Sequence, residues 1–463
     1  MSDPQTLSRV LDAVDAGLDQ SLERLFAFLR IPSISTDQAY AGECRAAAEW
    51  LAADLSTIGF STEICETGGH PAVVAKAPGT ADRRALFYGH YDVQPVDPLD
   101  LWETPPFEPR IATDETGARR IVARGACDDK GQVMTFVEAC RAWKQVTGSL
   151  PVGVTTLIEG EEESGSKHLF DFLRGNASKL AADVALVCDT GMWDAKTPAI
   201  TTSLRGLVYE EVKVIASNRD LHSGLYGGAA QNPIRVLSKV LAALHDDTGR
   251  VTIPGFYDGV DDLPNDVRAD WVALGLTAED FLGPIGLSLP AGEKGRLLIE
   301  MIQSRPTCDA NGIVGGYTGV GTKTVIPSEA SAKVSFRLVG RQNPIAVRDA
   351  FHAMVRSLIP ADCKVEFTSY KASPAIQLPW DMPVLTKARQ ALSDEWGTKA
   401  VMIGSGGSIP IVGDFKSILG LDTLLVGFGL DDDRVHSPNE KYNLTSFHKG
   451  TRSWVRVLAS LAS

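Results

Sequence analysis

The chain lacks any long uninterrupted apolar segment, although 44% of its 463 residues are hydrophobic. A transmembrane helix needs about 20 consecutive apolar residues, so we expect no membrane span and no membrane partner. The N-terminal sequence MSDPQTLSRV also lacks a basic segment followed by an apolar one, which argues against a secretory signal peptide. These absences predict a cytoplasmic protein.

Cysteine and positive charge are also in short supply. The seven cysteines are odd in number and form no Cys-x-x-Cys motif, which is typical of reduced thiols in the cytoplasm. The 45 Lys and Arg residues are outnumbered by 58 Asp and Glu, giving a net charge of −13. An acidic chain is poorly suited to bind nucleic acid or an anionic membrane surface. The same charge does not oppose binding of divalent cations.

The chain is too long for one ordinary core, so two domains are expected. Helical and buried-strand patterns alternate up to about Thr202, which predicts a mostly parallel, three-layer α/β domain. The apolar spacing predicts one N-terminal helix over Leu7–Leu29, stopped by Pro32. A hairpin is expected over Arg110–Ala123, around Thr116-Gly117.

After about Thr202 the pattern becomes β-α-β-β-α-β, the order of a ferredoxin-like domain. Its two halves are separated by Asp246–Pro306, which is rich in Gly, Pro and Asp and shows helical patterns only near Ala278–Phe281 and Lys294–Ile302. The α/β character returns after Pro379, so the second domain is an insertion in the first. We place the first domain at 1–203 and 376–463 and the inserted domain at 204–375.

The stretch Leu86–Pro95, read LFYGHYDVQP, is the feature around which the first domain is organised. An apolar run ends at Gly89 and is followed by His90 and Asp92, which predicts a buried strand with both side chains at its carboxyl end. Ligands bind at that end in open α/β sheets. An imidazole is a common metal ligand, and a nearby carboxylate can orient it. Alone, the motif favours a loop histidine capped by an aspartate.

Four further motifs place acids or a histidine in loops beside predicted sheet elements. Each has a plain structural alternative: a solvated acidic loop, a helix N-cap, an Asx turn or an ordinary loop histidine. Five such coincidences at sheet edges are improbable, so the pattern favours a single shared site. The motifs are RGACDDKG at 124–131, EGEEESGS at 159–166, Asp189 after VALVC, and VHSPNE at 435–440.

This set of side chains suits two divalent ions. Nitrogen and oxygen donors without thiolates fit Zn²⁺, Mn²⁺ or Co²⁺. A two-metal hydrolase needs one carboxylate shared by ions about 3.5–4 Å apart, terminal ligands on each ion, and a general base. The carboxylates exceed what one ion needs, so we expect two ions per chain.

These motifs, together with DLHSGLYGG at 220–228, resemble in order those of the M20 family of metallopeptidases. The likeness is greatest to the branch of carnosinases and cytosolic nonspecific dipeptidases, and it covers nearly the whole chain. It implies a di-metal catalytic domain, an inserted lid domain that forms a homodimer, and hydrolysis of a dipeptide with a free C-terminal carboxylate. The alternatives are removal of an N-acyl or N-carbamoyl group from an amino acid, and a metal-binding dimer without catalysis.

The resemblance also implies roles for individual residues. It makes Glu162 the general base and Asp92 the residue that orients His90, and it commonly places a cis peptide bond after the bridging aspartate. Glu161 receives no role and is expected to be exposed. The implied metal ligands are His90 and Asp189 on one ion, Glu163 and His436 on the other, and Asp128 between them.

Four lid and loop residues complete the implied site. His222 matches a histidine that reaches the partner subunit's active site, and Ser408 matches a loop lining the substrate pocket. Thr324 and Arg337 match positions that contact the substrate's carboxylate, for which a planar guanidinium is well suited. Gly404-Ser405 stands where dipeptidases of this branch often carry Arg-Glu, which leaves the exact substrate open.

Overall fold

A computed structural model of the chain describes residues 3–406 and 410–462. Two compact units are present: unit 1 contains Met1–Thr202, Leu378–Ile403 and Ile409–Ser463, and unit 2 is formed mainly by Ser203–Gln377. The chain passes from unit 1 to unit 2 after Thr202 and returns to unit 1 at Leu378. Within the described ranges, no helix combines the length and apolar character that crossing a membrane requires.

Unit 1 is built on a mixed sheet with the strand order β1-β2-β6-β3-β7-β17-β8, and β16 pairs with β8. The short strand β15, which pairs with the last two residues of β8, belongs to unit 2. The central pairs β6–β3, β3–β7 and β7–β17 are parallel, and the flanking pairs are antiparallel. The expectation of a mostly parallel sheet is therefore wrong at both edges. Connections such as the short loop from β1 to β2 permit only antiparallel pairing, because parallel strands need a crossover of about a dozen residues or more. The strands are β1 Ser61–Cys65, β2 Ala72–Ala77, β3 Gly79–His90, β6 Leu150–Glu159, β7 Val184–Val187, β8 Ala199–Leu204, β15 Ile376–Gln377, β16 Val401–Ser405 and β17 Thr423–Leu425.

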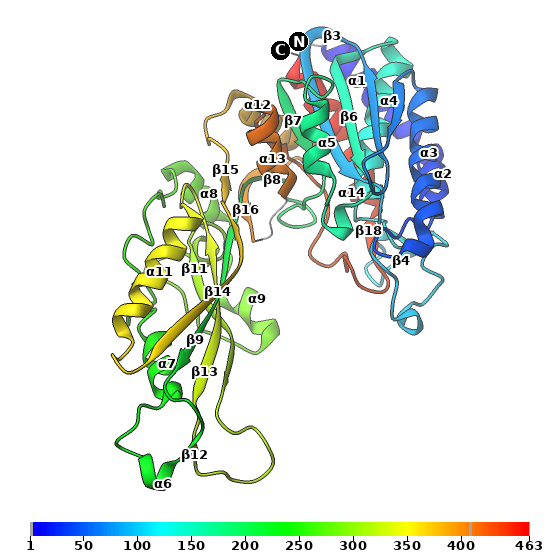
Figure 1. Cartoon of the computed structure of the whole chain (residues 1–463). Coiled ribbons are helices and arrows are strands. Elements are labelled where there is room, and N and C mark those ends of the chain that lie inside the picture. The colour runs from blue at the N-terminus through cyan, green and yellow to red at the C-terminus, as the bar shows by residue number, and fades with distance from the viewer. Residues whose placement is uncertain (1–2, 407–409, 463) are drawn as a thin grey trace. The chain divides into compact units, whose positions relative to one another are not determined.

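Both faces of this sheet are covered, which confirms the expected α/β class (Figure 1). Successive residues of β3 point to opposite faces. Phe87 stacks on Phe136 of α4 with ring centroids 3.7 Å apart, whereas Tyr88 packs edge-on against Phe415 at 5.7 Å. The helices of this unit are α1 Pro4–Ala16, α2 Leu18–Leu29, α3 Ala41–Thr57, α4 Lys130–Thr147, α5 Leu169–Asn176, α12 Pro383–Trp396, α13 Pro410–Asp414 and α14 Leu444–Leu461.

The N-terminal helix differs from the expectation. The stretch expected as one helix is divided into α1 and α2 at Gly17, whose φ of −92° and ψ of 2° are not helical. Glycine in a helix interior is destabilising by about 0.5–1 kcal/mol relative to alanine, so a break there is favoured. The break still allows Val14 of α1 and Leu25 of α2 to be buried.

A small three-stranded sheet, β18-β5-β4, also belongs to unit 1. The expected hairpin around Thr116-Gly117 is present as the antiparallel pair of β4 (Arg110–Thr113) and β5 (Arg119–Val122). The C-terminal strand β18 (Lys441–Asn443) pairs with β5. This pairing brings the loop before β18 next to the loop that follows β5.

Unit 2 contains a four-stranded antiparallel sheet with the order β11-β13-β9-β14. Helices α7 and α11 pack on it and enclose a core that includes Val212, Val240, Phe336 and Phe351. This is the expected ferredoxin-like β-α-β-β-α-β arrangement. The linking stretch contains a helix that the sequence pattern did not predict, α8, which buries only Val267 and Trp271. The elements are β9 Gly206–Ile215, β10 Leu221–His222, α6 Ser223–Tyr226, α7 Pro233–Ala242, α8 Asn265–Leu274, α9 Ala278–Leu282, α10 Leu298–Gln303, β11 Thr307–Gly315, β12 Val325–Ile326, β13 Glu329–Leu338, α11 Pro344–Leu358 and β14 Lys364–Ser373.

Candidate metal centre

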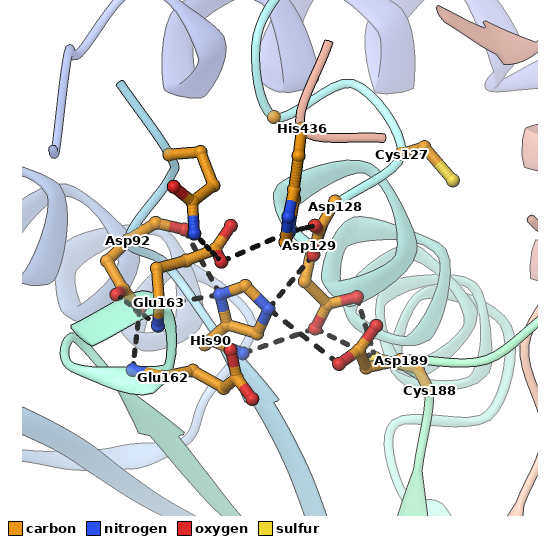
Figure 2. Close-up of polar contacts among 12 residues, drawn as sticks. His90, Asp92, Cys127, Asp128, Asp129, Glu162, Glu163, Cys188, Asp189 and His436 are labelled. Atoms are coloured by element: carbon orange, nitrogen blue, oxygen red, sulfur yellow. Dashed lines mark hydrogen bonds and ion pairs between the residues drawn. The ribbon is translucent and has the colours of Figure 1, made fainter. Parts of the chain in front are cut away.

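The candidate ligands of unit 1 come from the carboxyl ends of its parallel strands and from two loops (Figure 2). β3 ends at His90, the loop after β6 carries Glu163, and Asp189 follows β7. Asp128 lies just before α4, and His436 lies in the loop before β18. Parallel strands end at one edge of a sheet, which explains why residues far apart in sequence converge there.

Asp128 lies between two groups of donor atoms. Its Oδ1 is 3.2 Å from Nε2 of His90, and its Oδ2 is 3.0 Å from Nε2 of His436. Asp189 Oδ2 approaches the same His90 atom at 3.9 Å, and Glu163 Oε2 approaches the same His436 atom at 3.2 Å. Two sets result, His90/Asp128/Asp189 and Asp128/Glu163/His436, and within each set the donor atoms lie within 4.8 Å of one another.

The two sets fit divalent cations. They offer nitrogen and oxygen donors without a thiolate, and Asp128 presents one oxygen to each set, as a bridging carboxylate would. His90 is fully buried, and its Nε2 makes no hydrogen bond of acceptable geometry within the described residues. A buried polar atom without a hydrogen-bond partner is rare in folded proteins, and a role as a metal ligand is one accepted reason for it.

Crowding of acids shifts their proton affinities. Burial, and then the charge of Asp128, raise the pKa of Asp189 to about 7. Hydrogen bonds to Asp128 and then Glu163 raise the pKa of His436 to about 10. Burial alone would raise the pKa of Asp128, but the close imidazoles of His436 and His90 outweigh burial and lower it. In the metal-free chain, bound protons thus reduce the negative charge of the site, and bound cations would supply the same positive charge.

Asp92 is placed to orient His90. Its Oδ1 is 3.3 Å from Nδ1 of His90, and its main-chain oxygen lies 3.1 Å from the same atom. The Asp92 carboxylate also accepts hydrogen bonds from the backbone N–H of Glu162 at 3.3 Å and of Glu163 at 3.0 Å. Ser35 Oγ donates to it at 2.6 Å. Asp92 therefore fixes the imidazole and the acidic loop together.

Glu162 and Glu161 differ in their surroundings. Glu162 begins a short 3₁₀ turn and is half-buried, and burial is the main reason that its pKa is raised. Glu161 is only 8% exposed, so the expectation that it is exposed is wrong. Its carboxylate forms an ion pair with Nδ1 of His168 at 2.9 Å. The chain turns sharply at this point, which directs neighbouring side chains to different partners.

The peptide bond between Asp128 and Asp129 is cis, as expected. Asp129 occupies the N-cap position of α4, but its side chain makes no capping bond. It accepts instead from the backbone N–H of His90 at 3.2 Å and from Cys188 Sγ at 3.3 Å. Burial raises the pKa of both the Cys127 and the Cys188 thiols well above the ordinary value, which disfavours the thiolate that nucleophilic chemistry needs.

Three further residues support the site and were not singled out from the sequence. Gln94 Nε2 donates to Glu163 Oε2 at 2.7 Å, and Glu440 accepts from the backbone N–H of Asp128 at 3.0 Å. Both lie inside motifs already noted, GHYDVQP and VHSPNE, so motif membership was an available signal. Ser35 bonds Asp92 across 57 residues of sequence and has no local signal.

A cavity of about 490 Å³ opens beside Asp128 and Asp189. Gln132, Thr190 and Arg434 also line it. The candidate ligands thus border a space large enough for a small molecule, within the lower part of the range of about 300–1,000 Å³ typical of ligand pockets.

The proposed lid residues lie in unit 2. His222 is exposed, and its Nδ1 accepts from the backbone N–H of Gly224 at 2.9 Å. Thr324 is near it, because Ser223 N–H donates to the Thr324 carbonyl at 3.1 Å. Arg337 lies near the C-terminal end of β13, where it pairs with Leu207 of β9. Ser408 lies outside the described residues.

Comparisons with known proteins give the family. The family described as "Peptidase family M20/M25/M40" matches residues 86–460. The chain belongs to the M20 family. It is therefore a metallopeptidase, an enzyme that hydrolyses peptide bonds with divalent metal ions, and its two donor sets are the candidate metal ligands.

Individual M20 proteins resemble the chain over almost its full length. The Cys-Gly metallodipeptidase dug1 of Schizosaccharomyces pombe is 30% identical over 99% of both sequences. The crystal structure of human carnosine dipeptidase 1 is 27% identical, with a TM-score of 0.73 over 98% of each chain. That of an M20 metallo-carboxypeptidase, Sso-CP2 from Sulfolobus solfataricus, is 31% identical, with a TM-score of 0.75 over 96% of this chain and 99% of that one.

Proposed function

We propose that the chain is a dipeptidase that hydrolyses substrates with a free C-terminal carboxylate. The observation that carries this proposal is the position of Asp128, shared between two donor sets that gather at the carboxyl ends of the parallel strands. The choice of dipeptides is supported by relatives named as Cys-Gly and Beta-Ala-His dipeptidases, which match the chain at 30% and 31% identity.

The metal site follows from the two donor sets. His90 and Asp189 would hold one ion, Glu163 and His436 a second, and Asp128 both. Zn²⁺ suits this mixture of imidazole and carboxylate, and Mn²⁺ or Co²⁺ would also fit. When bound, the two ions would polarise the scissile carbonyl and lower the pKa of the attacking water.

Glu162 is the proposed general base. It would take the proton of the attacking water and later deliver it to the leaving amine, as a positioned carboxylate with a raised pKa can do. Asp92 would keep His90 in one orientation throughout, through the contacts at Nδ1.

The lid residues are proposed to act in a homodimer. Arg337 and Thr324 would contact the substrate carboxylate, Ser408 would line the pocket, and His222 would stabilise the oxyanion. Arg337 and Glu329 mark opposite ends of β13, and eight residues of strand span about 26 Å. His222 lies beyond the Glu329 end, beside β12. One lid therefore cannot easily supply both residues to one site, which supports His222 acting on the partner subunit's site.

The proposed setting is the cytoplasm, with no nucleic-acid or membrane partner. The seven cysteines are all free and buried, as expected of a reducing compartment. Placing the protein in isolated cytosol and membrane fractions by immunoblotting tests this part.

A substrate panel tests the reaction. The metal-loaded chain is incubated with dipeptides, the same dipeptides amidated at the C-terminus, N-acyl and N-carbamoyl amino acids, and longer peptides. We expect cleavage of the free dipeptides and a large loss on amidation. Release of amino acids from N-acyl or N-carbamoyl substrates alone would replace the proposal by an amidohydrolase. Preferred removal of the last residue from longer peptides would make the chain a carboxypeptidase.

A further inference from the structure

A buried ion pair outside the donor sets connects the loops that carry them. Glu440 is fully buried and Arg124 is 1% exposed. Arg124 Nη1 donates to Glu440 Oε2 at 2.7 Å. Neither residue belongs to a donor set. A buried charge pair is weak evidence for stability by itself, so the groups that it contacts decide what it does.

Glu440 binds the main chain of the loop that ends at Asp128. Its Oε1 accepts from the backbone N–H of Cys127 at 2.9 Å and of Asp128 at 3.0 Å. Its Oε2 accepts from the backbone N–H of Gly125 at 3.0 Å, in addition to Arg124. Hydrogen bonds to an ionised acceptor are about twice as strong as neutral ones. The peptide that presents Asp128 is therefore fixed by one carboxylate.

The same pair reaches two other loops of the site. Glu440 lies four residues after His436 in the same loop. The next residue, Lys441, begins β18 and pairs with Val122 of β5. On the other side, Arg124 Nη2 donates to the carbonyl of Pro95 at 2.9 Å, in the loop that follows His90. Three ligand-bearing loops thus meet at one ion pair.

We propose that the Arg124–Glu440 pair is a positioning device for the donor set Asp128/Glu163/His436. This inference rests on the proposed two-metal site. Two of the three donors in that set, Asp128 and His436, come from the loops that Glu440 joins. His90 and Asp189 follow strands β3 and β7, which the central sheet already fixes. Loss of the pair should therefore weaken metal binding at Asp128/Glu163/His436 more than at His90/Asp128/Asp189.

Calorimetric titration of the metal-free chain with Zn²⁺ tests the inference. We expect two binding events in the wild type. In Glu440→Gln the event at Asp128/Glu163/His436 should be weakened by about 10–100-fold, the usual effect of losing a residue that orients metal ligands, and the event at His90/Asp128/Asp189, which shares only Asp128, should be weakened much less. Thermal unfolding of the metal-free variant checks that it is folded. If the Glu440→Gln variant is not folded, Arg124→Lys takes its place, because lysine keeps the charge and lacks the planar guanidinium that donates two hydrogen bonds. This variant should weaken the same Zn²⁺ event to a smaller degree.

Glu395→Gln is the matched control. Glu395 is also a buried glutamate with two arginine partners, Arg452 at 2.6 Å and Arg456 at 2.8 Å, both on α14 and not on the ligand loops. Its substitution should lower the melting temperature and leave both Zn²⁺ events unchanged. If Glu440→Gln likewise lowered the melting temperature and left both Zn²⁺ events unchanged, the role of Glu440 would be purely structural and the proposal would be overturned.

A second background makes the test specific to one site. His436→Ala removes a donor from the affected set and should leave a single strong event. Adding Glu440→Gln to this variant should then change that event little, because the set on which Glu440 acts is already lost. Equal weakening of both events in Glu440→Gln, or further weakening in the double variant, contradicts the proposal. Failure of the proposed function would look different: a wild-type chain that binds two ions and cleaves no dipeptide.

Discussion

Substitution of Glu162 by glutamine removes the proposed base with little other change. The side chain keeps its size, and Glu162 contacts Asp92 through its backbone N–H at 3.3 Å, a hydrogen bond that glutamine retains. The Glu162 carboxylate makes no hydrogen bond within the described ranges, and it lies below His90 in Figure 2. We therefore expect the fold and the metal content to be preserved.

The expected loss is in turnover. A positioned general base contributes about 10²–10⁴-fold to the rate, which corresponds to about 2.7–5.4 kcal/mol in the activation free energy. Because a base acts in the transition state, kcat should fall with KM little changed. Steady-state assays with a dipeptide, together with metal analysis of the same preparation, measure both quantities.

Glu161→Gln is the matched control for this experiment. It makes the same chemical change one residue earlier, where the carboxylate is paired with His168 instead of facing the ligands. Its activity should remain close to that of the wild type. Wild-type turnover in Glu162→Gln, or an equal loss in Glu161→Gln, would refute the assignment of the base.

Three further predictions concern pH, the substrate carboxylate and the dimer. Burial raises the pKa of Asp189 to about 7 and of Glu159 to about 8, above unfolded values of about 3.9 and 4.3. Between these values the folded chain keeps protons that the unfolded chain has lost, so the melting temperature of the metal-free chain should fall from about pH 4 to about pH 8. Asp189→Asn should make this fall smaller. A melting temperature that rises over this range would contradict the prediction. Arg337→Ala should raise KM about 10–150-fold, the equivalent of about 1.5–3 kcal/mol for a bond to a charged group, and an unchanged KM would exclude that contact. Mixed dimers of His222→Ala and Glu162→Gln should recover activity in one site per dimer, and no recovery after verified subunit exchange would rule out action across the dimer.

The sequence identified the candidate ligands because their positions follow from local pattern. His90 ends β3, Asp189 lies just after β7, and Glu163 lies in the loop that follows β6, and parallel strands deliver such residues to one edge. The position of His436 does not follow from local pattern alone, because its loop is anchored by the pairing of β18 with β5. The sequence pattern placed VHSPNE in a loop beside a sheet element, and the motif resemblance then gave His436 its role as a ligand.

Features set by long-range contacts were not predictable in the same way. The burial of Glu161 depends on His168, and the role of Glu440 depends on a loop more than 300 residues earlier. The antiparallel edges of the sheet depend on connection length and not on the apolar pattern of each strand. The break at Gly17 was visible as a glycine, but apolar periodicity continues across it.

The account depends most on two ions sharing Asp128, and anomalous diffraction from Zn²⁺-loaded crystals measures this directly. We predict two zinc peaks about 3.5–4 Å apart, each bonded to a different oxygen of Asp128. One peak should also contact His90 and Asp189, and the other Glu163 and His436. A single fully occupied peak, or a second peak that does not touch Asp128, would contradict the two-metal mechanism proposed for this chain.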